Sequence, residues 1–220
     1  MLDSKQNYQE AAHNNGYEFS QGTGYQLPEY PFVEPPELAT REVKRHSIVI
    51  VGGGLAGLTL ACALAQYGVK ALLLDEDNTV GVKGASSRGI CYAQKTLEIF
   101  KRLGLSDRIA AKGVQWSVGR TFAGHHEVYS FDLKAQQMHN VSTQPPFINI
   151  QQFYVEGFLV EQIYKTIAAK PGVDLRWSHR ITAFEQNEDY ATLQLQTPAG
   201  SYALEATHVI DCSGARSPFR

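Results

Sequence analysis

Apolar and polar residues follow one another along this chain in blocks that predict an α/β protein. Residues 48–51 are a short apolar run without a polar side chain, and four glycines follow within 52–57. An uninterrupted helical pattern covers 58–67, and a second apolar run at 71–74 stops at Asp75. Buried strand, glycine turn, helix and buried strand, in this order, are typical of a βαβ unit.

Beyond this unit the patterns become shorter. Helices are expected at 92–103 and at 153–169, and the second ends at Lys170-Pro171-Gly172, a combination that stops helices. Alternating apolar residues predict a series of short strands. These strands are 116–122, 127–133, 147–150, 174–177, 181–186, 191–196, 201–206 and 208–211.

The first 45 residues differ from the rest. They are rich in Asn, Gln, Gly and Tyr and then in proline, so they bury too little apolar surface to offset the entropy cost of ordering. We therefore expect residues 1–45 to be a mobile polar and proline-rich extension. Two alternatives stay open for Tyr30, Phe32, Val33 and Leu38: an extended arm on the folded body, or part of a wholly disordered leader.

The glycine turn has the spacing of a dinucleotide-binding fingerprint, G-x-G-x-x-G. Gly52 permits the tight turn, Gly54 lets the backbone approach a pyrophosphate, and Gly57 allows close packing of helix on strand. The unpaired N–H groups at the helix start face the phosphates, and Asp75 accepts a hydrogen bond from the adenosine ribose. The expected cofactor-binding residues of this unit are Gly52, Gly53, Gly54, Leu55, Ala56, Gly57, Asp75 and Glu76. A glycine turn without a nucleotide is the alternative, and the unit alone fits NAD, NADP or FAD.

Composition excludes several classes of function. A length of 220 residues suits one sizeable domain or parts of two, and a formal net charge of −2 gives no support for nucleic-acid binding. Cys62, Cys91 and Cys212 lack the spacing of a zinc site, and no secretory signal opens the chain. A reduced, cytoplasmic setting is therefore expected. The uncharged stretch 48–65 contains three adjacent glycines and too short a helical part to cross a bilayer, so we expect no membrane span.

Other chemistry-bearing residues point to ordinary surfaces. His125, His126 and His139 have no carboxylate or cysteine at ligand spacing, so solvated hairpin histidines are expected rather than a metal site. Glu156 and Glu161 lie on one expected helix, where a solvated face is the default.

Three later segments decide among the nucleotides. Arg88 follows two serines in a glycine-rich loop, Gln152 opens the pattern Q-x-x-V-E-x-x-L, and residues 213–220 read Ser-Gly-Ala-Arg-Ser-Pro-Phe-Arg. Together with the glycine turn, these segments resemble the FAD-dependent aromatic hydroxylases, the flavoprotein monooxygenases of the p-hydroxybenzoate hydroxylase type. Segments 88–100 and 147–156 are most similar to the 3-(3-hydroxyphenyl)propionate hydroxylase-like branch.

The resemblance covers about 46–220 and implies an FAD-binding Rossmann-like domain. The first part of this domain is expected at 46–115, and its incomplete second part at 151–220. Between them, at 116–150, we expect a β-rich insertion that begins a substrate domain. The chain stops inside the last motif, so we expect a C-terminally truncated form.

The resemblance also implies roles for the later residues. Arg88 contacts the pyrophosphate or ribityl chain, Gln152 the ribityl region, and Gly214 belongs to a fingerprint for FAD and NAD(P)H. A solvated loop arginine and a polar helix-start residue are the alternatives for Arg88 and Gln152. Ser213 stands where the family has aspartate, which puts the use of the reductant in question, and Glu76 stands where many members have a basic residue.

The implied function is a monooxygenase in which NADH or NADPH reduces FAD and O2 hydroxylates a phenolic or other small aromatic substrate. Two alternatives remain: an inactive or partial FAD-binding fragment, and another flavin- or NAD-dependent oxidoreductase. The pattern names no catalytic residue, and it leaves open a homo-oligomer of the full-length form.

Overall fold

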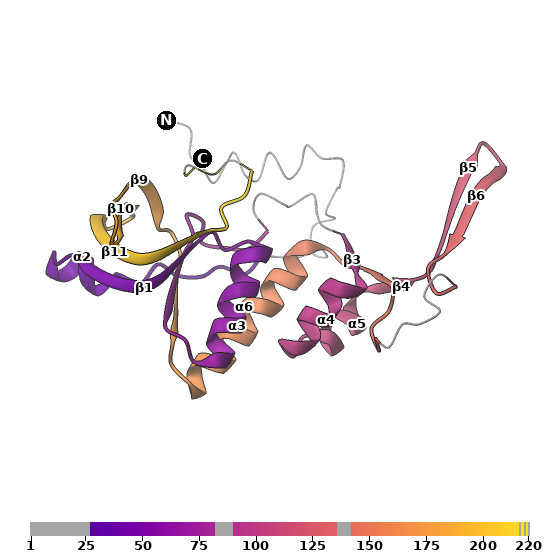
Figure 1. The fold of residues 1–220 in the computed structure, drawn as a ribbon, viewed down its shortest axis with the longest axis horizontal. Coiled ribbons are helices and arrows are strands. Elements are labelled where there is room, and N and C mark those ends of the chain that lie inside the picture. Colours follow the sequence, from indigo (N-terminus) through magenta and orange to yellow (C-terminus); the bar gives the residue numbers. More distant parts are fainter. Residues whose placement is uncertain (1–26, 82–89, 136–141, 216, 218, 220) are drawn as a thin grey trace.

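A six-stranded sheet forms the centre of the fold (Figure 1). The computed structural model describes residues 27–81, 90–135, 142–215, 217 and 219. The strands follow the order β8-β2-β1-β11-β10-β9, in which β8, β2, β1 and β11 are parallel and the last two pairings are antiparallel. Their bounds are Lys44–Val51 for β1, Ala71–Leu74 for β2, Val173–Arg176 for β8, Arg180–Gln186 for β9, Ala191–Thr197 for β10 and Gly200–Asp211 for β11.

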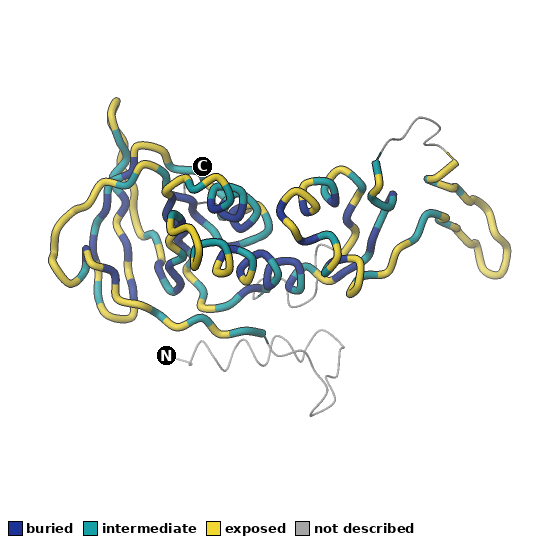
Figure 2. The backbone as a smooth tube through the Cα atoms, turned by 90° about the horizontal axis from the view of Figure 1, so that it is seen from below, coloured by how far each residue is buried: buried dark blue, intermediate teal, exposed yellow. Residues whose placement is uncertain are grey.

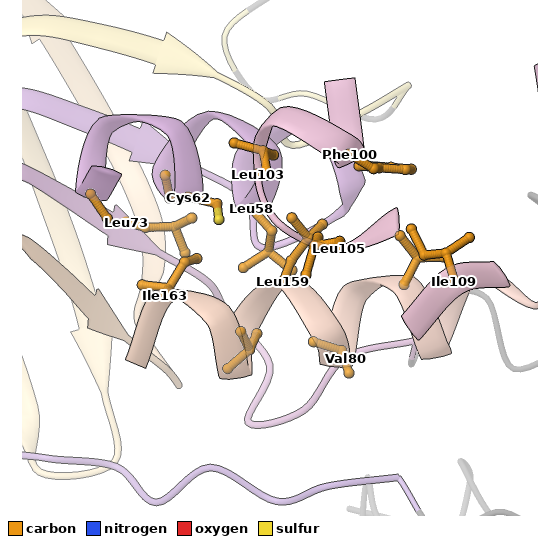
Figure 3. Close-up of a cluster of buried hydrophobic side chains, with 14 of the residues drawn as sticks. Leu58, Cys62, Leu73, Val80, Phe100, Leu103, Leu105, Ile109, Leu159 and Ile163 are labelled. Carbon is orange, nitrogen blue, oxygen red and sulfur yellow. The ribbon is translucent and has the colours of Figure 1, made fainter. Parts of the chain in front are cut away.

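Two helices, α3 (Leu55–Tyr67) and α6 (Gln152–Ala169), cover one face of this sheet. Figure 3 shows Leu58 and Cys62 of α3 beside Leu159 and Ile163 of α6, all of them buried in one cluster with Leu73 of β2. The opposite face of β1 and β2 is buried as well. It carries Val49, Val51, Leu72 and Leu74 in a second cluster with Leu193, Leu195, Tyr202 and Leu204 of β10 and β11. Burial on both faces explains why these parallel strands are apolar without alternation.

A smaller, mostly β part follows the first βαβ unit. A three-stranded sheet has the order β3-β7-β4, and a separate hairpin, β5 with β6, projects from it with mostly exposed residues (Figures 1 and 2). The helices α4 and α5 lie between this part and the central sheet (Figure 1). The bounds are Cys91–Ala93 for β3, Gln94–Arg102 for α4, Ser106–Lys112 for α5, Val114–Trp116 for β4, Val118–Ala123 for β5, His126–Asp132 for β6 and Phe147–Asn149 for β7.

The α/β fold and the βαβ unit expected from the sequence are confirmed, and most element bounds agree within two residues. The expected helix at 92–103 is wrong at its start, because Tyr92 pairs with Ile148 in a β-ladder before the helix begins. The two strands expected at 201–206 and 208–211 are one strand, β11. It continues because β10 pairs with its first half and β1 with its second half. The helix α5 was not expected.

Residues 27–45 are not part of a disordered leader: of the two alternatives, the structure agrees with an arm on the folded body, through Tyr30, Phe32 and Leu38. A short helix, α2 (Pro36–Thr40), forms there, and β1 begins at Lys44. Tyr30 stacks on Trp177 with ring centroids 4.5 Å apart, whereas Val33 is 71% exposed and does not dock. Packing against residues far along the chain orders this segment, and local composition does not report such contacts. Residues 1–26 lie outside the described part of the chain.

A buried ion pair holds the same segment. The Glu37 carboxylate accepts hydrogen bonds from Arg176 at 3.0 and 3.3 Å, and it lies 2.8 Å from Nε2 of His46. Arg176 also donates to Asp174 at 2.8 Å and to the Tyr202 hydroxyl at 3.2 Å. The N-terminal segment is thereby tied to β8, the edge strand of the central sheet.

Within the described ranges, no helix combines the length and the apolar character needed to cross a membrane.

Candidate functional site

The glycine turn lies at the carboxyl end of β1, between β2 and the segment that follows β11. Gly52 has φ +103°, and a Cβ on it would come within 2.6 Å of the Cys212 carbonyl oxygen. A Cβ on Gly57 would lie 1.9 Å from the Gly52 carbonyl oxygen. Both positions exclude a side chain, because the nearest atoms belong to backbone that cannot move aside.

Gly54 differs from these two glycines. Its φ of −81° is accessible to any residue, and a Cβ on it would meet only Oε1 of Glu156 at 3.9 Å. Gly54 is the N-cap of α3 and has no side chain to cap the helix, and Leu55 and Ala56 are the first helical residues. The first N–H groups of a helix lack intrahelical partners and attract anions. The backbone at Gly54 therefore offers a ligand close access to an anion-binding helix start.

Asp75 follows the last residue of β2 and is fixed next to this turn. Its Oδ2 accepts a hydrogen bond from the Gly53 amide at 2.5 Å, and its Oδ1 accepts one from the Asp77 amide at 2.8 Å. Gly53 itself is buried, and a Cβ there would come within 3.0 Å of Asp75. The neighbouring Glu76 is exposed and lies 4.0 Å from Arg180.

The first turn of α6 reaches the same place. Gln152 donates its Nε2 hydrogen to Oε1 of Glu156 at 2.7 Å, and Glu156 is only 2% exposed. The expected solvated face is thus wrong for Glu156. It holds for Glu161, whose side chain is 65% exposed and pairs with Arg108 at 2.7 Å. Glu156 occupies the buried stripe of α6 with Leu159, Val160 and Ile163, a spacing that was visible in the sequence.

Burial raises the pKa of Glu156. Hydrogen bonds from Gln152 and from the Gly81 and Leu55 amides oppose this rise, while the charge of Asp75 adds to it. The carboxyl group of Glu156, which lies at the start of α3, therefore takes up a proton more readily than the carboxyl group of an exposed glutamate does.

The segment after β11 completes the edge. Gly214 has φ +90°, and a Cβ there would meet no atom within 4 Å. The Asp211 carboxylate accepts hydrogen bonds from the amide and hydroxyl of Ser213 and from the hydroxyl of Ser217. Ser213 has no carboxylate of its own, but it donates hydrogen bonds to the carboxylate of Asp211. Sequence reasoning did not single out Asp211.

The structure brings most of the expected site residues together at one edge of the sheet. They meet at the carboxyl end of β1, which lies between β2 and β11. They are the glycine turn, Asp75, Gln152 and the 212–214 segment. In open α/β sheets, ligands bind outside the carboxyl ends of the strands, in a crevice of this kind. Arg88 lies outside the described residues, as do Arg216 and Arg220.

This arrangement agrees with a comparison against known families. Residues 45–220 match the family described as FAD binding domain. The chain belongs to this family. The match includes both the glycine turn and the segment after β11, so the FAD binding domain comprises every element of the edge described above.

Curated relatives of this FAD binding domain are monooxygenases and hydroxylases by name. It is 28% identical over 173 residues to para-nitrophenol 4-monooxygenase of Pseudomonas sp. (strain WBC-3), which covers 79% of this chain and 41% of that enzyme. It is 27% identical over 180 residues to 3-(3-hydroxy-phenyl)propionate/3-hydroxycinnamic acid hydroxylase of Mycobacterium sp. (strain JLS), covering 79% of this chain and 28% of that enzyme.

Solved structures show the same fold. The p-nitrophenol 4-monooxygenase PnpA from Pseudomonas putida DLL-E4 superposes with a TM-score of 0.71 at 29% identity, over 81% of this chain and 43% of that one. The flavin-dependent monooxygenase PieE, solved with FAD and substrate, gives 0.67 at 29% identity, over 79% of this chain and 31% of that one. The resemblance to the FAD-dependent aromatic hydroxylases is confirmed. The chain spans well under half the length of these relatives.

The residues at the edge fit an FAD molecule. The donors are backbone N–H groups at a helix start, and the open space at Gly54 admits a phosphate. A separate cavity of about 650 Å³ lies among α5, β4 and the 142–146 loop. None of the described residues expected to bind cofactor lines this cavity, so we assign it no cofactor role.

Proposed function

We propose that this chain binds FAD at the carboxyl edge of its central sheet and forms the flavin domain of an aromatic monooxygenase. In this proposal NADH or NADPH is the reductant, and O2 supplies the oxygen atom that enters a small phenolic or other aromatic substrate. The observation that carries the proposal is the open backbone at Gly54, at the start of α3 beside Asp75. The names of the relatives support the reaction class.

Each residue of the edge has a binding role in this proposal. The turn residues Gly52, Gly53, Gly54, Leu55, Ala56 and Gly57 surround the pyrophosphate, and Asp75 with Glu76 lies at the adenosine ribose. Gln152 hydrogen-bonds the ribityl chain, Gly214 lies against the flavin side, and Arg88 pairs with phosphate. Bound FAD supplies electron transfer and oxygen activation, while the protein binds it, orients it and limits access of water.

The domain division expected from the sequence belongs to this proposal. Residues 46–115 and 151–220 form the flavin domain in two parts, and 116–150 begin the substrate side. The projecting hairpin of β5 and β6 supports this division, because its exposed apolar residues Phe122, Val128 and Tyr129 pack on no part of the flavin domain among the described residues. The cytoplasmic setting is retained, and the three free thiols are consistent with it.

A second candidate is an FAD-binding chain without catalysis of its own. It is favoured by the 28–41% of the curated relatives' length that the chain spans. Purified chain that carries stoichiometric flavin and oxidises NADH or NADPH faster with a phenol present would contradict this candidate. Tight binding of NAD without flavin would instead favour another oxidoreductase class.

Replacing Gly54 by alanine tests the cofactor site without disturbing the fold. The added methyl group meets only ordinary van der Waals contact, so the fold is retained, but it fills the space through which a phosphate approaches the backbone. We expect FAD affinity to fall by at least about tenfold, which is about 1.4 kcal/mol. Quenching of flavin fluorescence measures the affinity, and circular dichroism checks the fold.

The matched control is Gly124→Ala at the turn of the β5–β6 hairpin. Its φ of +63° makes alanine strained by about 1 kcal/mol, but a Cβ there meets no atom. This variant should lose a little stability and keep its FAD affinity. Equal FAD affinity in Gly54→Ala and the unmodified chain would place the pyrophosphate elsewhere.

A further inference from the structure

Glu156 places a carboxylate where an anion-binding helix start is open. Its Oε1 lies 3.9 Å from the position of a Cβ on Gly54, and its carboxylate accepts the amide hydrogen of Leu55, the first residue of α3. A third contact, from the Gly81 amide, joins the carboxylate to the loop after β2. Glu156 therefore lies beside helix-start N–H groups that lack partners within the helix.

FAD brings a second anion to the same position. A pyrophosphate at a glycine turn uses the N–H groups of the helix start and approaches the backbone at the second glycine, here Gly54. An ionised Glu156 and a pyrophosphate would then share one set of donors a few ångströms apart. Two like charges in a partly buried site disfavour each other, and protonation of the carboxyl group removes this repulsion.

We propose that Glu156 competes with the pyrophosphate for the N–H groups at the start of α3 and takes up one proton when FAD binds. This inference rests on the proposed FAD site and adds a pH dependence to it. Glu156 is a positioning residue here, since it acts on the helix start and on the charge of the site rather than on the reacting flavin ring.

The groups around Glu156 favour this protonation. Asp75, directly after β2, is a further negative charge, Tyr92 of β3 is a phenol whose pKa is raised by burial and by the charge of Glu156, and Gln152 of α6 is neutral. Among the described residues, the other partners that affect its pKa are the amides of Leu55 and Gly81. None of these described groups is a cation that would hold the carboxylate ionised. Burial, the largest effect, and the Asp75 charge both raise the pKa of Glu156.

The test is the pH dependence of FAD binding by the full 220-residue chain between about pH 5.5 and 8.5. For a single coupled proton, the dissociation constant should rise with pH and approach a tenfold change per pH unit above the pKa of Glu156. The variant Glu156→Gln should bind FAD with a nearly constant affinity, and more tightly than the unmodified chain at the alkaline end. Glu161→Gln, a change on the exposed side of the same helix, should keep the original pH profile.

A flat profile for the unmodified chain, or the same slope in Glu156→Gln, would overturn the inference while leaving the FAD site intact. Absence of FAD binding at every pH would overturn the proposed function instead. In that case, the titration of the buried Glu156 carboxyl group is tested by unfolding the chain without FAD at several pH values. Because the folded pKa is raised, its stabilising contribution is full below the unfolded pKa and is lost as pH rises through the folded pKa. The stability advantage of Glu156→Gln should therefore grow with pH, and a constant difference would reject a titrating buried carboxyl group.

Discussion

Replacing Gly57 by alanine is expected to unfold the dinucleotide-binding turn and to abolish FAD binding. The added Cβ would lie 1.9 Å from the Gly52 carbonyl oxygen, far inside contact distance. Overpacking of a core costs about 1–3 kcal/mol and more where nothing can yield. We expect a loss of at least about 3 kcal/mol, a large share of the 5–15 kcal/mol that holds a typical domain together.

The surroundings of the Gly52 carbonyl explain why the clash cannot relax. Gly52 donates its amide hydrogen to the Leu74 carbonyl of β2 at 2.8 Å, and its Cα faces the backbone of Cys212 after β11. The turn is therefore held from two strands at once. To accept a methyl group, α3 would have to separate from β1 and open the cluster around Leu58 and Cys62.

Chemical denaturation followed by circular dichroism measures this loss. Gly54→Ala, three residues earlier in the same turn, serves as the matched control and should unfold near the concentration that unfolds the original chain. If Gly57→Ala also unfolds there, the helix and strand are less tightly packed than the distance indicates.

The parts of the fold that the sequence predicts well are local ones. The glycine spacing, the apolar runs and the acid after the second run are properties of 30 consecutive residues, and they suffice for a βαβ unit. Tyr92 was assigned to a helix because its strand partner, Ile148, lies 56 positions away, and β11 appeared divided because its two halves have different partners. Such pairings are tertiary, and periodicity along one segment does not contain them.

The candidate site divides in the same way. The turn and Asp75 were found because their spacing carries the chemistry. Glutamate as a residue type predicts a solvated Glu156, whereas its position on the apolar stripe of α6 predicts burial. Asp211 does not stand out in the sequence, because its partners Ser213 and Ser217 belong to the segment that carries the family motif. A charged residue on an otherwise apolar stripe is the signal to look for in such chains.

The largest effect outside the turn is expected from Arg176→Met, which breaks the buried ion pair of the N-terminal segment. The side chains of Arg176 and Glu37 are 8% and 1% exposed, so the substitution leaves the Glu37 carboxylate buried with His46 as its remaining side-chain partner in an ion pair or hydrogen bond. Breaking a buried pair from one side costs about 3–5 kcal/mol. Residues 27–40 should detach from β8 and become accessible to protease, and Trp177, on which Tyr30 stacks, should report the change by its fluorescence.

Two comparisons separate the buried pair from ordinary charge effects. Arg108→Met removes an ion pair with Glu161 whose side chains are 40% and 65% exposed, so it should cost no more than about 1 kcal/mol. The double variant Glu37→Leu with Arg176→Met leaves no uncompensated buried charge, since the Asp174 side chain is 57% exposed, and should regain most of the stability. A loss in the double variant as large as in Arg176→Met would assign the effect to packing instead.

Acid should release the same segment. Burial raises the pKa of Glu37, but its backbone hydrogen bond and the hydrogen bonds and charge of Arg176 outweigh burial, and the pKa lies below its ordinary value. The stabilisation from this depressed carboxyl pKa is present above the unfolded pKa and is lost as pH falls through the folded pKa. The protease sensitivity of residues 27–40 should therefore rise below about pH 4 in the unmodified chain. In the double variant, which carries no carboxyl group at position 37, this acid-dependent step should be absent.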